Sequence, residues 1–264
     1  MWRPTRRRAH DAPMSYLVLA RKYRPRRFED MVGQEVVTGV LRGAIDEGRI
    51  GHAYLFAGPR GTGKTTTARI LAKALNCERG PTPDPCGVCE RCVASDEGTE
   101  LDVIEIDAAS NTSVNDVREL RDQVNYAPVG ARFKIYIVDE VHMLSRAAFN
   151  ALLKTLEEPP GHVKFLFATT ELHKVPDTIL SRCQVLRLSP IREEAIQQRL
   201  DEVFAAEQVE AEPGVAAELA RRARGGGRVA VGLSGLHDVA GAGAAGWHAA
   251  MTHGVVLWAF GVTY

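Results

Sequence analysis

One stretch of eight residues carries the residue types that bind phosphate groups. It fits the pattern G-x-x-x-x-G-K-[ST], directly after a short apolar run and directly before a helical pattern. Its residues, with the threonine that follows, are Gly58, Pro59, Arg60, Gly61, Thr62, Gly63, Lys64, Thr65 and Thr66. Glycines let the backbone curl so that its N–H groups surround phosphate oxygens at the positive end of a helix. Lys64 would reach the β- and γ-phosphates of ATP, and the Thr65 hydroxyl would ligate Mg²⁺. An ordinary glycine-rich turn is the alternative, but the pattern arises by chance in only roughly one chain per hundred of this length.

Two adjacent carboxylates follow a buried apolar run. The run Ile135 to Val138 leads into Asp139 and Glu140, and open α/β sheets bind ligands at the carboxyl ends of their strands. Asp139 would hold the metal through water, while Glu140 would orient and polarise an attacking water. A solvated strand end is the alternative, and the phosphate-binding loop argues against it. The pair therefore predicts hydrolysis of ATP as well as binding.

Four cysteines have the spacing of a metal site. Cys77, Cys86, Cys89 and Cys92 form C-x₈-C-x₂-C-x₂-C, with prolines and a glycine supplying turns between them. Four thiolates can close a tetrahedron around Zn²⁺ and leave no position open for water, so we predict a structural zinc site. An iron–sulfur cluster is the rival, although the ferredoxin spacing is not matched. The fifth cysteine, Cys183, stands apart.

The elements that must position these residues alternate between strand and helix. Apolar runs, mostly continuous as in strands covered on both faces, predict five strands at Tyr54 to Phe56, Val103 to Ile106, Ile135 to Val138, Phe165 to Ala168 and Val185 to Leu188. Helical spacing predicts helices from Val37 to near Gly48, at Thr65 to Leu75, Val114 to Val124, and Phe149 to Leu156 before Pro159. This alternation predicts an α/β domain with a parallel five-stranded sheet.

The chain divides into segments of different composition. We expect a disordered basic leader or a misassigned start over residues 1–13, since Met14 is a second possible start. The α/β core spans 14–189, with the cysteine module inserted at 77–98, and a helical segment follows at 190–224. Residues 225–264 contain one acidic residue, Asp238, and show no sustained helix or strand periodicity. We therefore expect a divergent or frameshifted tail that is poorly ordered.

Composition limits the partners and the compartment. The 264 residues include 33 Lys plus Arg and 33 Asp plus Glu. The formal net charge is therefore zero, and no overall positive charge attracts the chain to nucleic acid or anionic lipid. The apolar run behind the first arginines is too short for a signal peptide, and no run is long enough to span a membrane. We therefore expect a cytoplasmic protein.

Several stretches together resemble one family. MSYLVLARKYRPRRFEDMVGQE, HAYLFAGPRGTGKTTTARILAKALNC, the four cysteines, IYIVDEVHMLS and FLFATTELHKVPDTILSRCQ are similar to the gamma/tau subunits of bacterial DNA polymerase III across roughly residues 14 to 224. The resemblance implies an AAA+ P-loop ATPase core with a small helical lid. It also implies membership of the DNA-directed DNA polymerase (nucleotidyltransferase) holoenzyme as a subunit that does not itself polymerise.

What the resemblance implies is a clamp loader, a ring of subunits that uses ATP to open the sliding clamp and place it on primed DNA. Its partners would be the delta and delta-prime subunits and further gamma/tau copies. Thr170, with Thr169, would sense the γ-phosphate, and Arg182 would reach a neighbouring subunit's ATP as an arginine finger. Tyr23 and Val32 would line the adenine pocket. From the residues alone, Arg182 could equally form a surface salt bridge.

The resemblance ends near residue 224. The family's lid normally carries Gly-Ser-x-Arg-Asp there, whereas this chain reads Gly225-Gly226-Gly227-Arg228-Val229. This departure puts ring assembly in doubt and keeps two alternatives open. One is another AAA+ DNA-remodelling ATPase, such as a branch-migration helicase, and the other is a nucleotide-dependent scaffold without turnover.

Overall fold

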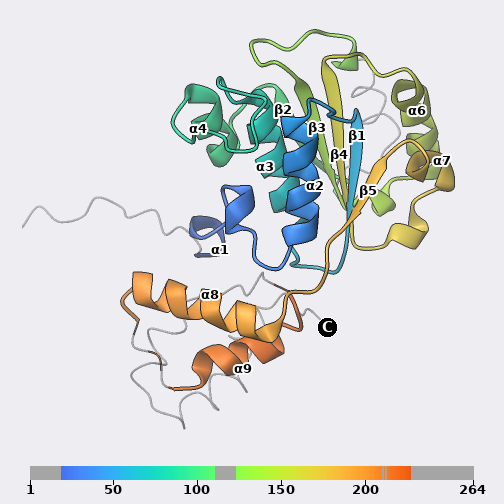
Figure 1. The fold of residues 1–264 in the computed structure, drawn as a ribbon. Helices are drawn as coiled ribbons and strands as arrows, with labels where there is room; N and C mark the ends of the chain where they lie inside the picture. Colours follow the sequence, from blue (N-terminus) through green and yellow to red (C-terminus); the bar gives the residue numbers. More distant parts are fainter. Residues whose placement is uncertain (1–18, 111–122, 210, 212, 227–264) are drawn as a thin grey trace, which may run out of the picture.

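The computed structural model describes residues 19–110, 123–209, 211 and 213–226 (Figure 1). The expected leader over 1–13, most of the helix expected over 114–124, and nearly all of the tail expected over 225–264 lie outside these residues. Within the described ranges, none of the helices combines the length and the apolar character that a transmembrane crossing requires.

A five-stranded parallel sheet forms the centre of the molecule (Figure 1), as the sequence predicts. The strands are β1 (Ala53–Ala57), β2 (Val103–Asp107), β3 (Lys134–Asp139), β4 (Val163–Thr169) and β5 (Gln184–Arg187). Their order across the sheet is β2-β3-β4-β1-β5. Ala57 pairs with Thr169 and Asp107 pairs with Asp139. The register therefore brings the carboxyl ends of four strands to one edge.

Helices cover both faces of the sheet, which is why the central strands β1, β3 and β4 are apolar without alternation. On one face, α2 (Glu35–Asp46) and α3 (Lys64–Asn76) enclose a core with Ile135, Ile137 and Leu166. On the other, α6 (Arg146–Glu157) encloses a core with Phe165 and Phe167. All seven residues of β4 are buried. The sheet is therefore the rigid middle layer of three, and its edge can hold functional residues firmly.

Local sequence signals set the ends of the two helices nearest the edge. α3 begins after Gly63, whose φ of 100° lies in the left-handed region that favours glycine. α6 begins after Ser145, whose hydroxyl accepts a hydrogen bond from the Ala148 N–H at 3.2 Å. Short elements complete the core: α1 (Leu19–Lys22), η1 (Phe28–Asp30), α4 (Glu90–Glu97), η2 (Val141–Met143), η3 (Leu172–Lys174) and α7 (Asp177–Leu180).

Two further helices, α8 (Glu193–Ala206) and α9 (Val215–Arg222), pack on each other away from the sheet (Figure 1). Their apolar faces share a core of Ile191, Ile196, Leu200, Val203, Phe204, Ala216, Leu219 and Ala220. Tyr23 and Val32, from the N-terminal segment, pack against this core. The pair therefore stands beside the sheet edge, held there partly by residues that precede β1. The domain boundaries at 189 and 224 stay predictions.

Candidate functional site

A cavity of about 460 Å³ opens at the carboxyl edge of the sheet. This volume lies within the range of roughly 300–1,000 Å³ that is usual for small-molecule sites. Its walls come from the N-terminal segment, the loop between β1 and α3, the ends of β2 and β3, and α8. The lining residues are Tyr23, Arg24, Pro25, Asp30, Met31, Val32, Arg60, Gly61, Thr62, Gly63, Lys64, Thr65, Thr66, Asp107, Ala109, Asp139, Glu140, Ile191, Ala195, Ile196, Arg199, Leu200 and Val203.

The loop between β1 and α3 has the form that the phosphate-binding pattern requires. A Cβ atom on Gly58 would lie 2.5 Å from the carbonyl oxygen of Leu188, so only glycine fits where the loop leaves the sheet. The Lys64 ammonium and the Thr62 hydroxyl each donate to the Pro59 carbonyl at 2.9 Å. Lys64 is therefore folded across the loop, at the N-terminal end of α3 where the helix dipole favours an anion.

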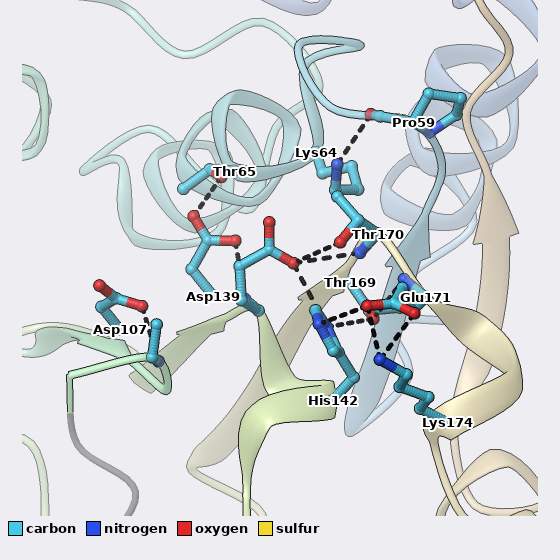
Figure 2. A network of polar contacts seen from close by, with 12 residues as sticks. Pro59, Lys64, Thr65, Asp107, Asp139, His142, Thr169, Thr170, Glu171 and Lys174 are labelled. Carbon is cyan, nitrogen blue, oxygen red and sulfur yellow. Dashed lines mark hydrogen bonds and ion pairs between the residues drawn. The ribbon is translucent and has the colours of Figure 1, made fainter. Parts of the chain in front are cut away.

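Thr65 and Asp139 meet although 74 residues separate them in sequence (Figure 2). The Thr65 hydroxyl donates to Oδ2 of Asp139 at 2.7 Å, while Oδ1 accepts from the backbone N–H of Glu140 at 2.9 Å. A hydroxyl and a carboxylate side by side are the hard oxygen ligands that Mg²⁺ accepts, usually with waters completing the octahedron. These two residues therefore fit a Mg²⁺ ion beside the phosphate loop.

Glu140 has an unusual backbone conformation. Its φ of 47° and ψ of 45° place a residue with a full side chain in the left-handed region, where strain of about 1–3 kcal/mol is common at functional sites. Oε2 accepts hydrogen bonds from the hydroxyl of Thr170 at 2.9 Å and from its backbone N–H at 3.2 Å. Thr170 thus contacts Glu140 directly, although it does not line the cavity.

His142 also belongs to this group, and sequence reasoning missed it. Its Nδ1 lies 3.1 Å from the Thr169 hydroxyl (Figure 2), and its ring also contacts the carboxylates of Glu140 and Glu171 at 3.4 and 3.3 Å. The only signal in the sequence was its place three residues after Asp139. That spacing does not distinguish a functional histidine from a histidine that is merely buried in the core.

The far side of the cavity comes from the N-terminal segment and α8. Tyr23 and Val32, expected at an adenine pocket, both line the cavity. The hydrogen bond from the Tyr23 hydroxyl to Glu207 raises the pKa of that hydroxyl. Five residues of α8 were placed by the sequence only in the helical segment 190–224 and not at a site: Ala195, Ile196, Arg199, Leu200 and Val203. All five line the cavity.

Arg182 lies apart from the cavity. It follows α7 and pairs with Glu157, and its guanidinium donates to the carbonyl of Thr178 at 2.7 Å. Its side chain keeps 31 % of its surface exposed. It therefore does not serve the nucleotide site of its own chain, and its role toward a neighbouring subunit stays a prediction. Gly58 and Pro59, also predicted to bind nucleotide, shape the loop without lining the cavity.

The four cysteines of the C-x₈-C-x₂-C-x₂-C pattern come together in space. Their Sγ atoms all lie within 4.8 Å of one another, and those of Cys86 and Cys92 are 3.9 Å apart. A tetrahedral zinc site with Zn–S bonds of about 2.3 Å has S–S edges of about 3.8 Å, so the cluster fits zinc. Hydrogen bonds from the backbone N–H groups of Val88 and Cys89 lower the pKa of Cys86 to about 6.

Cys183 lies outside the cluster, as expected. It packs against the core beneath α6, and burial raises the pKa of its thiol to about 12. A thiol with so high a pKa is neither a nucleophile nor a ready metal ligand at neutral pH.

Solved structures share this fold. The RuvB Holliday junction branch migration motor of Thermotoga maritima superposes with a TM-score of 0.59 at 22% identity, over 82% of this chain and 66% of that chain. At this identity the likeness shows the fold alone. With the strand order and the cysteine cluster, it confirms the predicted α/β core with a parallel five-stranded sheet and an inserted group of four cysteines.

Curated relatives share far more sequence. The DNA polymerase III subunit tau of Escherichia coli (strain K12) is 56% identical over 221 residues, which are 84% of this chain and 34% of that protein. The tau subunit of Bacillus subtilis (strain 168) is 53% identical over 220 residues, 83% of this chain and 39% of that protein. The chain thus spans little more than a third of the length of these relatives. The family model described as DNA polymerase III, delta subunit, matches residues 33–192, more than half of the chain. The chain therefore belongs to the family of DNA polymerase III subunits that this model describes, and its curated relatives are tau and gamma subunits.

Proposed function

We propose that this chain binds ATP with Mg²⁺ and hydrolyses it, as the motor domain of a clamp-loader subunit. The observation that carries the proposal is the contact between Thr65 and Asp139 at 2.7 Å, with Lys64 and Glu140 in the lining of the same cavity. A phosphate loop, two magnesium ligands and a carboxylate base are the parts that phosphoryl transfer to water requires.

Each residue has a defined part in this proposal. Lys64 leaves the Pro59 carbonyl and contacts the β- and γ-phosphates, while the loop N–H groups bind the remaining phosphate oxygens. Thr65 and Asp139 hold Mg²⁺, which when bound neutralises charge on the phosphates. Glu140 orients a water molecule toward the γ-phosphate, and Thr170 holds Glu140 in place. Tyr23, Val32 and α8 enclose the base of the nucleotide.

Assembly with other subunits is the second part of the proposal. The relatives are named as subunits of DNA polymerase III, and Arg182 is exposed away from its own cavity. An arginine supplied in trans stabilises charge in the transition state, by about 10³–10⁵ in rate where measured in GTPases. We propose that Arg182 completes the site of a neighbouring gamma/tau, delta or delta-prime subunit. The assembled ring would then load the sliding clamp on primed DNA in the bacterial cytoplasm.

The cysteine cluster is proposed to hold a structural Zn²⁺. Its four ligands leave no position open for a reacting water, so the ion would stabilise the module without taking part in hydrolysis.

Nucleotide binding and steady-state hydrolysis by the purified chain test the first part. We expect wild-type protein to bind ATP and turn it over. Lys64→Ala should lose binding, and Glu140→Gln should keep binding but lower kcat by about 10²–10⁴-fold, as for loss of a general base. Exposed control variants Lys154→Ala and Glu158→Gln should match wild type. Failure of wild-type protein to bind ATP would overturn the proposal.

Adding sliding clamp and primed DNA to the same assay separates the alternatives. Stimulation that requires both supports a clamp loader. Stimulation by DNA alone favours a helicase-like motor, and tight binding without turnover under every condition favours a scaffold.

A further inference from the structure

His142 joins two carboxylates that belong to different elements. The residue lies in η2, two positions after Glu140, and its side chain is only 6 % exposed. Nδ1 is 3.4 Å from Oε2 of Glu140 and 3.1 Å from the Thr169 hydroxyl, and Nε2 is 3.3 Å from Oε1 of Glu171. Both ring nitrogens therefore face oxygen atoms, and Figure 2 shows His142 beside Thr169 and Glu171.

Glu171 provides a fixed support for this ring. Its carboxylate accepts from the Lys174 ammonium at 2.9 Å, and its backbone N–H donates to the Thr169 hydroxyl at 3.1 Å. The hydrogen bond from Lys174 lowers the pKa of Glu171, so the side chain stays ionised at neutral pH. When a carboxylate binds one nitrogen of an imidazole, it fixes the orientation of the ring and so the direction of the other nitrogen.

The position of Glu140 depends on these contacts. Its backbone adopts a left-handed conformation just after β3, and hydrogen bonds to its side chain hold the carboxylate. Among the described residues, every hydrogen bond accepted by that carboxylate is made by Oε2, from the hydroxyl and the N–H of Thr170. His142 Nδ1 approaches the same oxygen. Oε1 is therefore the oxygen that can face a water molecule at the γ-phosphate.

We propose that His142 is a positioning residue for hydrolysis: with Nε2 facing Glu171 and Nδ1 hydrogen-bonded to Thr169, the ring fixes the strand end at which Thr170 holds Oε2 of Glu140, so that Oε1 points at the attacking water. The proposal rests on the proposed function, because it assigns Glu140 as the base. His142 itself is not among the residues that line the cavity. Its removal should therefore affect the chemical step and leave binding unchanged.

Kinetics of three variants test this role. In His142→Ala we expect kcat to fall about tenfold to hundredfold, as when a group that orients a catalytic ligand or base is removed. KM and the Kd for ATP should stay within about threefold of wild type, because the substitution removes no contact that binds the ground state of ATP. His142→Asn, whose amide can replace Nδ1, should recover part of the loss. His173→Ala is the matched control, since that histidine is exposed and reaches only Glu171 within the described part of the chain, and it should behave as wild type.

The ring's ¹⁵N resonances give a readout that does not depend on turnover. We expect Glu140→Gln to move the His142 Nδ1 signal and Glu171→Gln to move the Nε2 signal. If the resonances respond to neither substitution, or if kcat is unchanged in His142→Ala, the proposed role of His142 is wrong. A rise in KM with constant kcat would assign His142 to binding instead. If wild-type protein binds ATP but hydrolyses none, the proposed function fails at its catalytic step, while the resonances still report whether His142 contacts the two carboxylates.

Discussion

Asp102 is a buried carboxylate that anchors the loop before β3. The residue is 2 % exposed, and its side chain accepts hydrogen bonds from the backbone N–H groups of Val129, Gly130 and Ala131 at 2.8, 3.0 and 2.7 Å. Burial alone would raise the pKa of Asp102, but these donors together outweigh it, so the pKa lies below its ordinary value. The loop it fixes leads directly into the strand that ends at Asp139.

We expect Asp102→Asn to lower the free energy of unfolding at pH 7 by about 1–3 kcal/mol, because an amide cannot accept from all three donors. The native carboxylate has a lower pKa than the unfolded one. It therefore stabilises the fold above the unfolded-state value of about 4, and this contribution is lost as the pH falls through the lower, folded-state pKa. Denaturant unfolding between pH 7 and 3 measures the difference. The exposed control Asp46→Asn should match wild type, and a constant gap between Asp102→Asn and wild type at every pH would contradict this account.

The cysteine module is an element with little regular structure of its own. Cys77 directly follows α3, and Cys89 directly precedes α4, which contains Cys92. Between them the chain forms turns over residues 78–89. The nearly buried ammonium of Lys73 pairs with Asp96 at 2.6 Å and provides one further tie to the core. Metal ligation would therefore supply most of the module's order.

We predict that one Zn²⁺ binds per chain, and that chelation opens residues 77–98 to protease while the sheet persists. The reason is that the ligands connect α3 to α4 across the turns. Metal analysis, limited proteolysis and circular dichroism after treatment with a chelator measure the effect. Cys92→Ser should lose the zinc, whereas Cys183→Ala, outside the cluster, should keep it. Protein that remains protease-resistant and free of metal would argue against a structural zinc.

These elements also show what local sequence can predict. The strands and the helix after the phosphate loop are set by apolar runs, a glycine turn and a following helical pattern, and the structure confirms them. The cysteine spacing likewise predicted a cluster that the structure brings together. The left-handed conformation of Glu140 has no such signal, since no glycine or asparagine marks it. It arises where the strand end must turn into η2.

At the scale of the whole molecule, the sequence could not predict which residues close the cavity. An apolar stripe such as Ile196, Leu200 and Val203 has the same spacing whether it faces a core or a ligand. Here it does both, because α8 packs on α9 and also lines the cavity. The contact between α8 and the N-terminal residues Tyr23 and Val32 depends on the tertiary fold, because these residues lie far apart in the sequence.

Glu207 links the end of α8 to the N-terminal segment. Glu207 follows α8 directly, and its carboxylate accepts from the ammonium of Lys22 and the hydroxyl of Tyr23, each at 2.5 Å. Tyr23 lines the cavity. The hydrogen bonds with Lys22 and Tyr23 lower the pKa of Glu207, which keeps its carboxylate ionised for both donors. Opening α8 away from the sheet would break this link.

ATP should therefore stabilise the whole fold, and Glu207 should contribute to the effect. A ligand at a hundred times its Kd adds about 2.7 kcal/mol, which corresponds to a rise in Tm of roughly 5–10 °C for a chain of this size. We expect wild-type protein to show this rise, Lys64→Ala to show none, and Glu207→Ala to show a smaller one at the same ATP concentration because its Kd is higher. Glu194→Ala, an exposed acid on the same helix, should match wild type. Equal rises in Glu207→Ala and wild type would mean that α8 closes without this link.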